Sequence, residues 1–147
     1  MKLKTDTFYI QNNKSDLYYA SLAYHRNNTR KSEKSQWRIS IKEEFQVFND
    51  CFINFSWFDN HIGWGIYLDP ETKSNMLQIG ISTIKNPLHF IKYVDGGKDN
   101  MWHGYPADYL RKIQDKPSSI FLNEIYSRGF ISKPQYSKIK KGKKCNL

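Results

Sequence analysis

The densest group of side chains able to do chemistry lies between residues 102 and 109, which read Trp-His-Gly-Tyr-Pro-Ala-Asp-Tyr. Histidine is the side chain that most often acts as a general acid or base, so His103 is the candidate for proton transfer. Tyr105, Asp108 and Arg111 are close to it in the sequence and can orient an imidazole or hold a phosphate. The pattern predicts a site here, and it equally fits aromatic side chains that pack the segment onto a sheet.

Further groups could complete an acid–base site around His103. His89 lies on a predicted strand, and Lys98 lies in the turn that follows this strand. Two histidines and a lysine are sufficient to cleave RNA through its own 2′-hydroxyl without a metal ion. In this interpretation the catalytic residues are His103, His89, Lys98 and Asp108.

Basic residues are concentrated at the C-terminal end of the chain. Residues 125–147 hold seven Lys and Arg and no Asp or Glu, whereas residues 1–124 contribute only +2 to the net charge of +9. Such a segment can bind phosphates by releasing counterions, attract an acidic protein, or simply keep the protein in solution. The predicted binding residues are Trp102, His103, Tyr105, Arg111, Arg128, Lys138, Lys140, Lys141, Lys143 and Lys144.

Motifs for metals and cofactors do not occur in the sequence. The four histidines have no HxxxH spacing, and Cys51 and Cys145 stand far apart rather than in a CxxC pair. Neither a P-loop nor a GxGxxG motif is found. We therefore expect no metal and no cofactor. We also expect both cysteines to be free thiols, because short secreted chains held by disulfides normally carry more cysteines.

The distribution of apolar residues along the chain indicates the compartment in which the protein resides. No apolar run approaches the roughly 20 residues that span a bilayer. Residues 1–6 carry two lysines without the apolar segment of a signal peptide behind them. We expect a cytoplasmic protein with no membrane partner.

The elements that must position the site follow an α+β pattern. Residues 16–26 favour an N-terminal helix, with Ser15 or Asp16 as its cap. Alternating or apolar runs joined by turn residues then predict an antiparallel sheet of about four to six strands. These runs are 37–41, 45–48, 51–58, 62–68, 76–82 and 88–94. Residues 102–109 would form a loop after the last strand, where a rigid scaffold commonly carries function.

Two short helices are predicted at the C-terminal end. Residues 119–128 carry an apolar stripe and are followed by Gly129. Ser132 and Gln135 form the sequence signature of a capping box for the second helix, which Gly142 ends. Residues 1–147 would then be a single domain, with a basic C-terminal segment at 133–147 whose order the pattern leaves open. The predicted core is Ile53, Phe55, Trp57, Ile66, Leu77, Ile79, Ile81, Phe90 and Ile125.

Composition suggests two classes of function. Nine Phe, ten Tyr and four Trp are more than a core of this size hides, so exposed rings are expected to contact RNA bases or a protein. The chain has three alanines and two valines, which indicates AT-rich codons and fits a mobile locus that carries toxins and their inhibitors. The leading hypothesis is a non-catalytic protein like an immunity protein or antitoxin, which binds an acidic surface of a toxin. The alternative is an RNA-binding protein or a metal-free ribonuclease toxin that uses His103.

Overall fold

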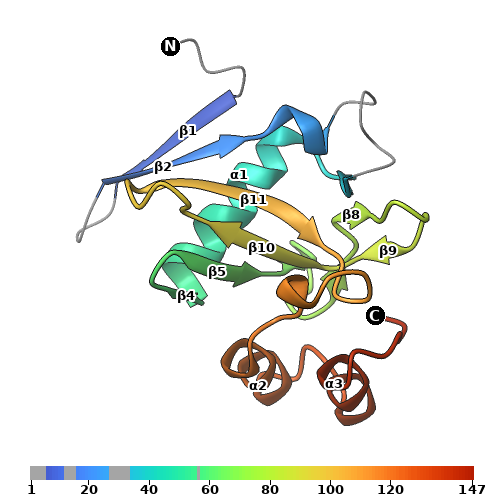
Figure 1. Cartoon of the computed structure of the whole chain (residues 1–147). Helices are drawn as coiled ribbons and strands as arrows, with labels where there is room; N and C mark the ends of the chain where they lie inside the picture. Colours follow the sequence, from blue (N-terminus) through green and yellow to red (C-terminus); the bar gives the residue numbers. More distant parts are fainter. Residues whose placement is uncertain (1–5, 12–15, 27–33, 56) are drawn as a thin grey trace.

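The computed structural model describes residues 6–11, 16–26, 34–55 and 57–147. Its largest sheet has six strands (Figure 1). The strand order is β1-β2-β11-β10-β5-β4. Every neighbouring pair is antiparallel except β2 and β11, which run parallel. The bounds are β1 Asp6–Gln11, β2 Asp16–Ser21, β4 Phe58–Asp59, β5 Ile62–Gly65, β10 Phe90–Val94 and β11 Met101–Ala107. The predicted α+β class with a mainly antiparallel sheet is confirmed.

Shorter strands and three helices complete the described residues. A three-stranded sheet has the order β3-β8-β9, and β6 pairs with β7 in a hairpin. The bounds of these strands are β3 Gln36–Trp37, β6 Tyr67–Leu68, β7 Met76–Leu77, β8 Gly80–Ile81 and β9 Pro87–Leu88. The helices are α1 Ile41–Asp50, α2 Ser119–Ser127 and α3 Lys133–Lys140. None of the described helices is long and apolar enough to cross a membrane.

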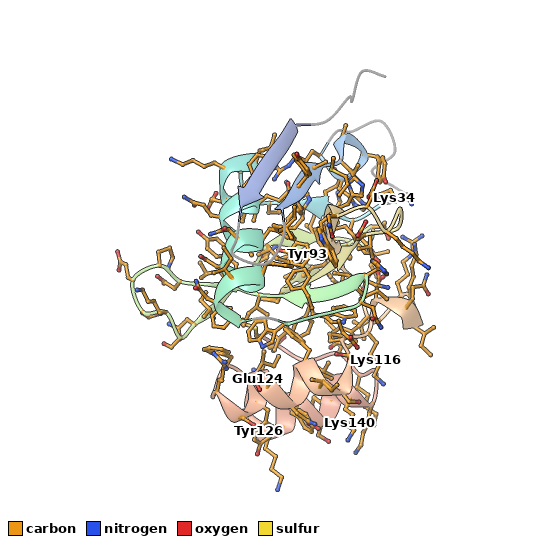
Figure 2. All side chains as sticks on the ribbon, turned by 90° about the vertical axis from the view of Figure 1, so that its left-hand side faces the viewer. Lys34, Tyr93, Lys116, Glu124, Tyr126 and Lys140 are labelled. Carbon is orange, nitrogen blue, oxygen red and sulfur yellow. The ribbon has the colours of Figure 1, made fainter. Side chains whose placement is uncertain are left out.

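Helix α1 packs across one face of the six-stranded sheet (Figure 1). Phe48 of this helix is fully buried, and its ring lies 4.6 Å from that of Tyr19 and 5.1 Å from that of Tyr93. Figure 2 shows Tyr93 in the interior, between α1 and the strands. Burial of these large rings stabilises the packing of α1 on the sheet by several kcal/mol, at about 25 cal/mol per Å² of apolar surface.

Helices α2 and α3 pack on the opposite face, near β5 and β10 (Figure 1). Phe121 of α2 contacts the rings of Trp64 and Phe90, and Ile139 of α3 is fully buried in the same cluster. Serine caps start both helices, and the predicted capping box of Ser132 and Gln135 is present. The two C-terminal helices are therefore confirmed with nearly the predicted bounds, because their start signals are local.

Three strand glycines leave room for aromatic rings on the face that α1 covers. A Cβ at Gly63 would lie 2.2 Å from the Phe58 ring, and one at Gly65 would lie 2.8 Å from Tyr93. A Cβ at Gly104 would likewise lie 2.6 Å from the Tyr93 ring and 2.7 Å from the Tyr19 hydroxyl. Glycine at these positions thus lets aromatic rings lie close to the strand backbone.

Replacing Gly104 by alanine tests this packing. We expect Gly104→Ala to lower the free energy of unfolding by about 1–3 kcal/mol, because neither ring can move without disturbing the core. Gly96→Ala is the matched control, since nothing lies within 4 Å of a Cβ there. Urea unfolding followed by tryptophan fluorescence measures both. Equal effects from the two substitutions would contradict the packing account.

The predicted N-terminal helix is wrong. Residues 16–21 form β2, and a single 3₁₀ turn, Ala23–His25, follows it. Leu17 and Tyr19 are buried while Tyr18 is exposed, which is the alternation of a strand. The alternation of buried and exposed residues, together with the pairing of β2 with β1 and β11, therefore outweighs the capping signal at Ser15 and Asp16.

The strands predicted at 45–48 and 51–58 are also wrong for most of their length. Residues 41–50 form α1, which begins at a capping box of Ser40 and Glu43, and a π-helical turn, Cys51–Phe55, extends it. Residues two apart do not share a face of a helix. Ile53 is consequently 47% exposed instead of buried.

The remaining predicted core residues divide into two groups. Ile66, Ile79, Phe90 and Ile125 are buried as expected. Phe55, Trp57, Leu77 and Ile81 are half-buried, because they lie on turns or on strands of two residues at the margin of the fold.

Candidate functional site

The candidate site is a cavity of about 260 Å³ between the 23–25 turn, β11 and the 3₁₀ turn Ile113–Asp115. We call it the histidine cavity, because two imidazoles line it. The side chains relevant to its chemistry are Tyr24, His25, Lys34, His103, Tyr105, Asp108, Arg111, Lys112 and Asp115. The loop predicted at 102–109 is instead strand β11 up to Ala107, so a rigid strand carries His103 and Tyr105.

His103 is placed by the alternation of β11. Trp102, Gly104 and Pro106 are buried, and Gly104 touches Tyr93 on the side of α1, so His103 and Tyr105 point to the other face. The Nδ1 atom of His103 lies 3.3 Å from the Ala20 carbonyl oxygen on the parallel neighbour β2. A carbonyl can only accept, so this contact assigns the proton to Nδ1 and leaves Nε2 for a ligand.

His25 is held in the same manner from the other side of the cavity. Its Nδ1 donates to the Ser35 carbonyl oxygen at 2.9 Å, which again leaves Nε2 for a ligand. The ring is buried and stacks on Tyr105, with 5.3 Å between centroids and 10° between planes. Burial lowers the pKa of His25 below its usual value of 6.5, and the nearby Lys34 charge acts in the same direction, although the bond to Ser35 opposes both. His25 is therefore a neutral imidazole at pH 7.

Tyr105 and Asp115 form the floor of the cavity. The Tyr105 hydroxyl donates to Asp115 Oδ1 at 2.8 Å, and the Asp108 amide donates to Asp115 Oδ2 at 3.2 Å. Burial raises the pKa of Tyr105, and the Asp115 carboxylate raises it further. Tyr105 therefore keeps its proton and serves as a rigid platform for His25. The buried Lys92 ammonium fixes this floor to the sheet by donating to the Gln114 carbonyl oxygen at 2.6 Å.

Three cations line the cavity together with two carboxylates. Lys34 lies 5.7 Å above the ring of Tyr24, which is 44% exposed, and Arg111 donates to the Thr83 hydroxyl at 3.3 Å. The charge of Asp115 is partly satisfied by its two donors. The cavity thus offers positive charge to an anion and, in Tyr24, an exposed ring at its margin.

A buried ion pair fixes the chain that carries His25. Glu44 on α1 is completely buried and accepts hydrogen bonds from Ser21 at 2.8 Å, from the Tyr19 hydroxyl and from Arg26 at 2.7 Å. Arg26 also donates to the Ile39 carbonyl oxygen at 2.8 Å. Because Arg26 follows His25 directly, this network anchors the end of the 23–25 turn and thereby the position of the imidazole.

The structure brings together some of the predicted site residues and separates others. His103, Tyr105, Asp108 and Arg111 line the histidine cavity. His89 lines a different cavity, and Lys98 is exposed in the turn between β10 and β11. Trp102 lies in the core on the α1 face, at 4% exposure.

The predicted basic residues near the C-terminus lie outside this cavity. Arg128 contacts the rings of Phe55 and Trp57 in a separate groove. In Figure 2, Lys34 and Lys140 lie near opposite ends of the molecule. Lys138, Lys140 and Lys141 are exposed on α3 and its end, and Lys143 and Lys144 follow in a segment that folds back. There the Tyr109 hydroxyl donates to the Lys143 carbonyl oxygen at 2.8 Å.

Sequence reasoning missed five of the side chains relevant to the chemistry of the cavity: Tyr24, His25, Lys34, Lys112 and Asp115. The sequence pattern predicts His25 at the end of a helix, and no local signal shows that β2 pairs in parallel with β11.

In the described part of the chain no group of three His, Cys, Asp or Glu could hold a metal ion. Comparisons with protein-family models, curated proteins and solved structures give no match. The functional argument therefore rests on the geometry.

Proposed function

We propose that this protein binds RNA at the histidine cavity and cleaves it by acid–base chemistry through the 2′-hydroxyl. The observation that carries the proposal is the pair of imidazoles. His25 and His103 line one cavity, and each is held at Nδ1 by a backbone carbonyl so that Nε2 serves a ligand. Two pre-oriented imidazoles can move one proton to and one proton from the same phosphodiester.

The reaction follows from the roles that the two rings can take. Neutral His25 accepts the proton of the 2′-hydroxyl as its oxygen forms a bond to phosphorus. The bond from phosphorus to the 5′-oxygen breaks, and His103 in its protonated form gives that oxygen a proton. The products are a 2′,3′-cyclic phosphate and a 5′-hydroxyl. Lys34, Arg111 and Lys112 can stabilise the extra negative charge that develops on the phosphoryl oxygens.

The substrate class follows from the nucleophile. The 2′-hydroxyl is part of RNA and missing from DNA, so two imidazoles suffice for RNA. A cavity of about 260 Å³ is at the small end of ligand sites, which suits a phosphate and its ribose with the base outside. The exposed ring of Tyr24 offers a stacking surface for that base.

The direct test uses the purified full chain and a fluorescent single-stranded RNA in the presence of EDTA. We expect cleavage that EDTA does not slow, and no cleavage of DNA of the same sequence. His61→Asn is the control for loss of a histidine, because His61 lies outside the cavity and the asparagine amide can take over its contact with Asp95. RNA that stays intact at high protein concentration would contradict the proposal.

The pH dependence gives a separate prediction. A base must be deprotonated to act, and burial lowers the pKa of His25. We therefore expect kcat/KM to rise with pH along a limb centred below 6.5, the usual value for histidine. Lys34→Gln should move this limb to higher pH, because the Lys34 charge contributes to the lowered pKa. A rising limb centred above 6.5 would exclude His25 as the base.

A second candidate function is the binding of an acidic surface on a toxin, as an inhibitor does. It is favoured by a groove of about 980 Å³ between α1 and the β6–β7 hairpin, where exposed parts of Phe45 and Phe55 lie among three cations and two carboxylates: Lys42, Lys73, Arg128, Asp50 and Asp69. Expression with and without the neighbouring open reading frame separates the candidates. Growth arrest by this protein alone supports RNA cleavage. Rescue of cells from the neighbouring product, lost in Arg128→Ala, supports inhibition.

A further inference from the structure

A second cavity, of about 290 Å³, lies beside the histidine cavity. Asp108 lines both cavities, which places them next to each other. The segment joining β8 to β9 connects them, since Arg111 donates to Thr83 at 3.3 Å and Lys144 donates to the Asn86 side chain at 3.5 Å. We call this second space the tail cavity, because residues 144–147 form one of its walls.

The walls of the tail cavity combine apolar surface with amide groups. Leu88, Phe90 and Tyr109 supply apolar and aromatic surface, and Gln78 and Asn86 supply amides. Amide side chains can donate to and accept from the edge of a nucleobase, and an aromatic ring can stack on its face. His89, which does not line the histidine cavity, adds a further ring to the wall of the tail cavity.

Four cations accompany the Asp108 carboxylate along the two cavities and the β8–β9 segment between them. Lys112 and Arg111 line the histidine cavity, and Lys144 lines the tail cavity. Lys85 lies between Thr83 and Asn86 on the exposed β8–β9 segment. These four cations can neutralise the phosphates of a strand that passes from one cavity to the other.

We propose that the tail cavity is a second subsite, which takes a base of the same single-stranded RNA whose phosphodiester lies in the histidine cavity. This inference rests on the proposed function for the identity of the ligand. A single strand fits because only an unpaired base can turn away from its neighbours into a cavity of this kind. The arrangement makes the protein prefer an oligonucleotide over a dinucleotide.

The test removes the cations of the connecting surface. We use the double variant Lys85→Gln with Lys144→Gln, and a control of equal net charge, Arg38→Gln with Lys98→Gln, at exposed basic residues outside both cavities. The first readout is the KM for a six-nucleotide RNA and for a dinucleotide. We expect the test variant to raise the KM of the hexamer about tenfold, with kcat and the dinucleotide kinetics unchanged. Equal effects on both substrates, or no effect, would overturn the second subsite.

The second readout is binding of a 2′-O-methyl RNA hexamer, which does not depend on cleavage. Each phosphate contact contributes about 0.7 to the slope of log affinity against log salt. The test variant should therefore lower this slope by about 1.4, and the control variant should leave it unchanged. Binding with this pattern but without cleavage of ordinary RNA would support the subsite while refuting the proposed reaction. No binding of the hexamer at low salt would overturn the subsite itself.

Discussion

His103→Gln is expected to reduce RNA cleavage at least about 100-fold, because it removes the proton donor for the leaving 5′-oxygen. Glutamine places its amide near the position of Nε2 rather than Nδ1, so it gives up only the 3.3 Å bond from Nδ1 to the Ala20 carbonyl oxygen. His103 is half-exposed on the rigid strand β11, so the fold should tolerate the change. Rates on a fluorescent RNA and urea unfolding curves are measured on the same preparation.

The matched comparison is His61→Asn, which removes a histidine outside the cavity. It should keep the wild-type rate within a factor of about two. A His103→Gln protein that folds normally and keeps more than a tenth of the activity would show that His103 is not the acid. In that case the ring would only fill the margin of the cavity.

Glu44→Gln is expected to lower the free energy of unfolding by about 3–5 kcal/mol, because it leaves the Arg26 charge without its partner in a buried network. Glu44 is completely buried, and Arg26 donates to it at 2.7 Å while also holding the Ile39 carbonyl. The change keeps the side-chain volume, so the effect measures charge and hydrogen bonds rather than a cavity. Urea unfolding measures this cost.

An exposed ion pair supplies the control for Glu44. Glu124 on α2 and Arg128, which follows its last residue, form an i,i+4 pair at 2.8 Å, and both side chains are 41% exposed. Glu124→Gln should cost no more than about 0.5 kcal/mol. A similar cost for both substitutions would mean that the Glu44 network does not anchor the 23–25 turn.

The parts of the fold that the sequence predicts are those with local signals. The starts of α2 and α3 depend on residues within one turn, such as Ser132 and Gln135, and both were predicted. The same signature at Ser40 and Glu43 starts α1, but the aromatic residues that follow it are typical of strands. Rings such as Phe48 belong in α1 because Tyr19 and Tyr93, distant in the sequence, pack against them.

The residues of the histidine cavity likewise fall into those that the sequence predicts and those that it does not. His103, Tyr105, Asp108 and Arg111 are close in sequence and could be found together. The second imidazole could not, because His25 reaches the cavity only through the parallel pairing of β2 with β11 and the ion pair of Arg26 with Glu44. Parallel pairing between distant strands leaves no mark on either strand alone. His89 is the histidine that the sequence suggests as the partner of His103, but it lies between β9 and β10 and lines the other cavity.

The most direct measurement of the central claim is the chemistry of the cut ends. A DNA oligonucleotide with a single ribonucleotide is incubated with the wild-type protein, and the products are identified by mass spectrometry. Transfer through the 2′-hydroxyl by His25 and His103 predicts one cut, on the 3′ side of the ribonucleotide, with a 2′,3′-cyclic phosphate and a 5′-hydroxyl. An intact oligonucleotide, cuts elsewhere in the DNA, or a 5′-phosphate end would contradict the account.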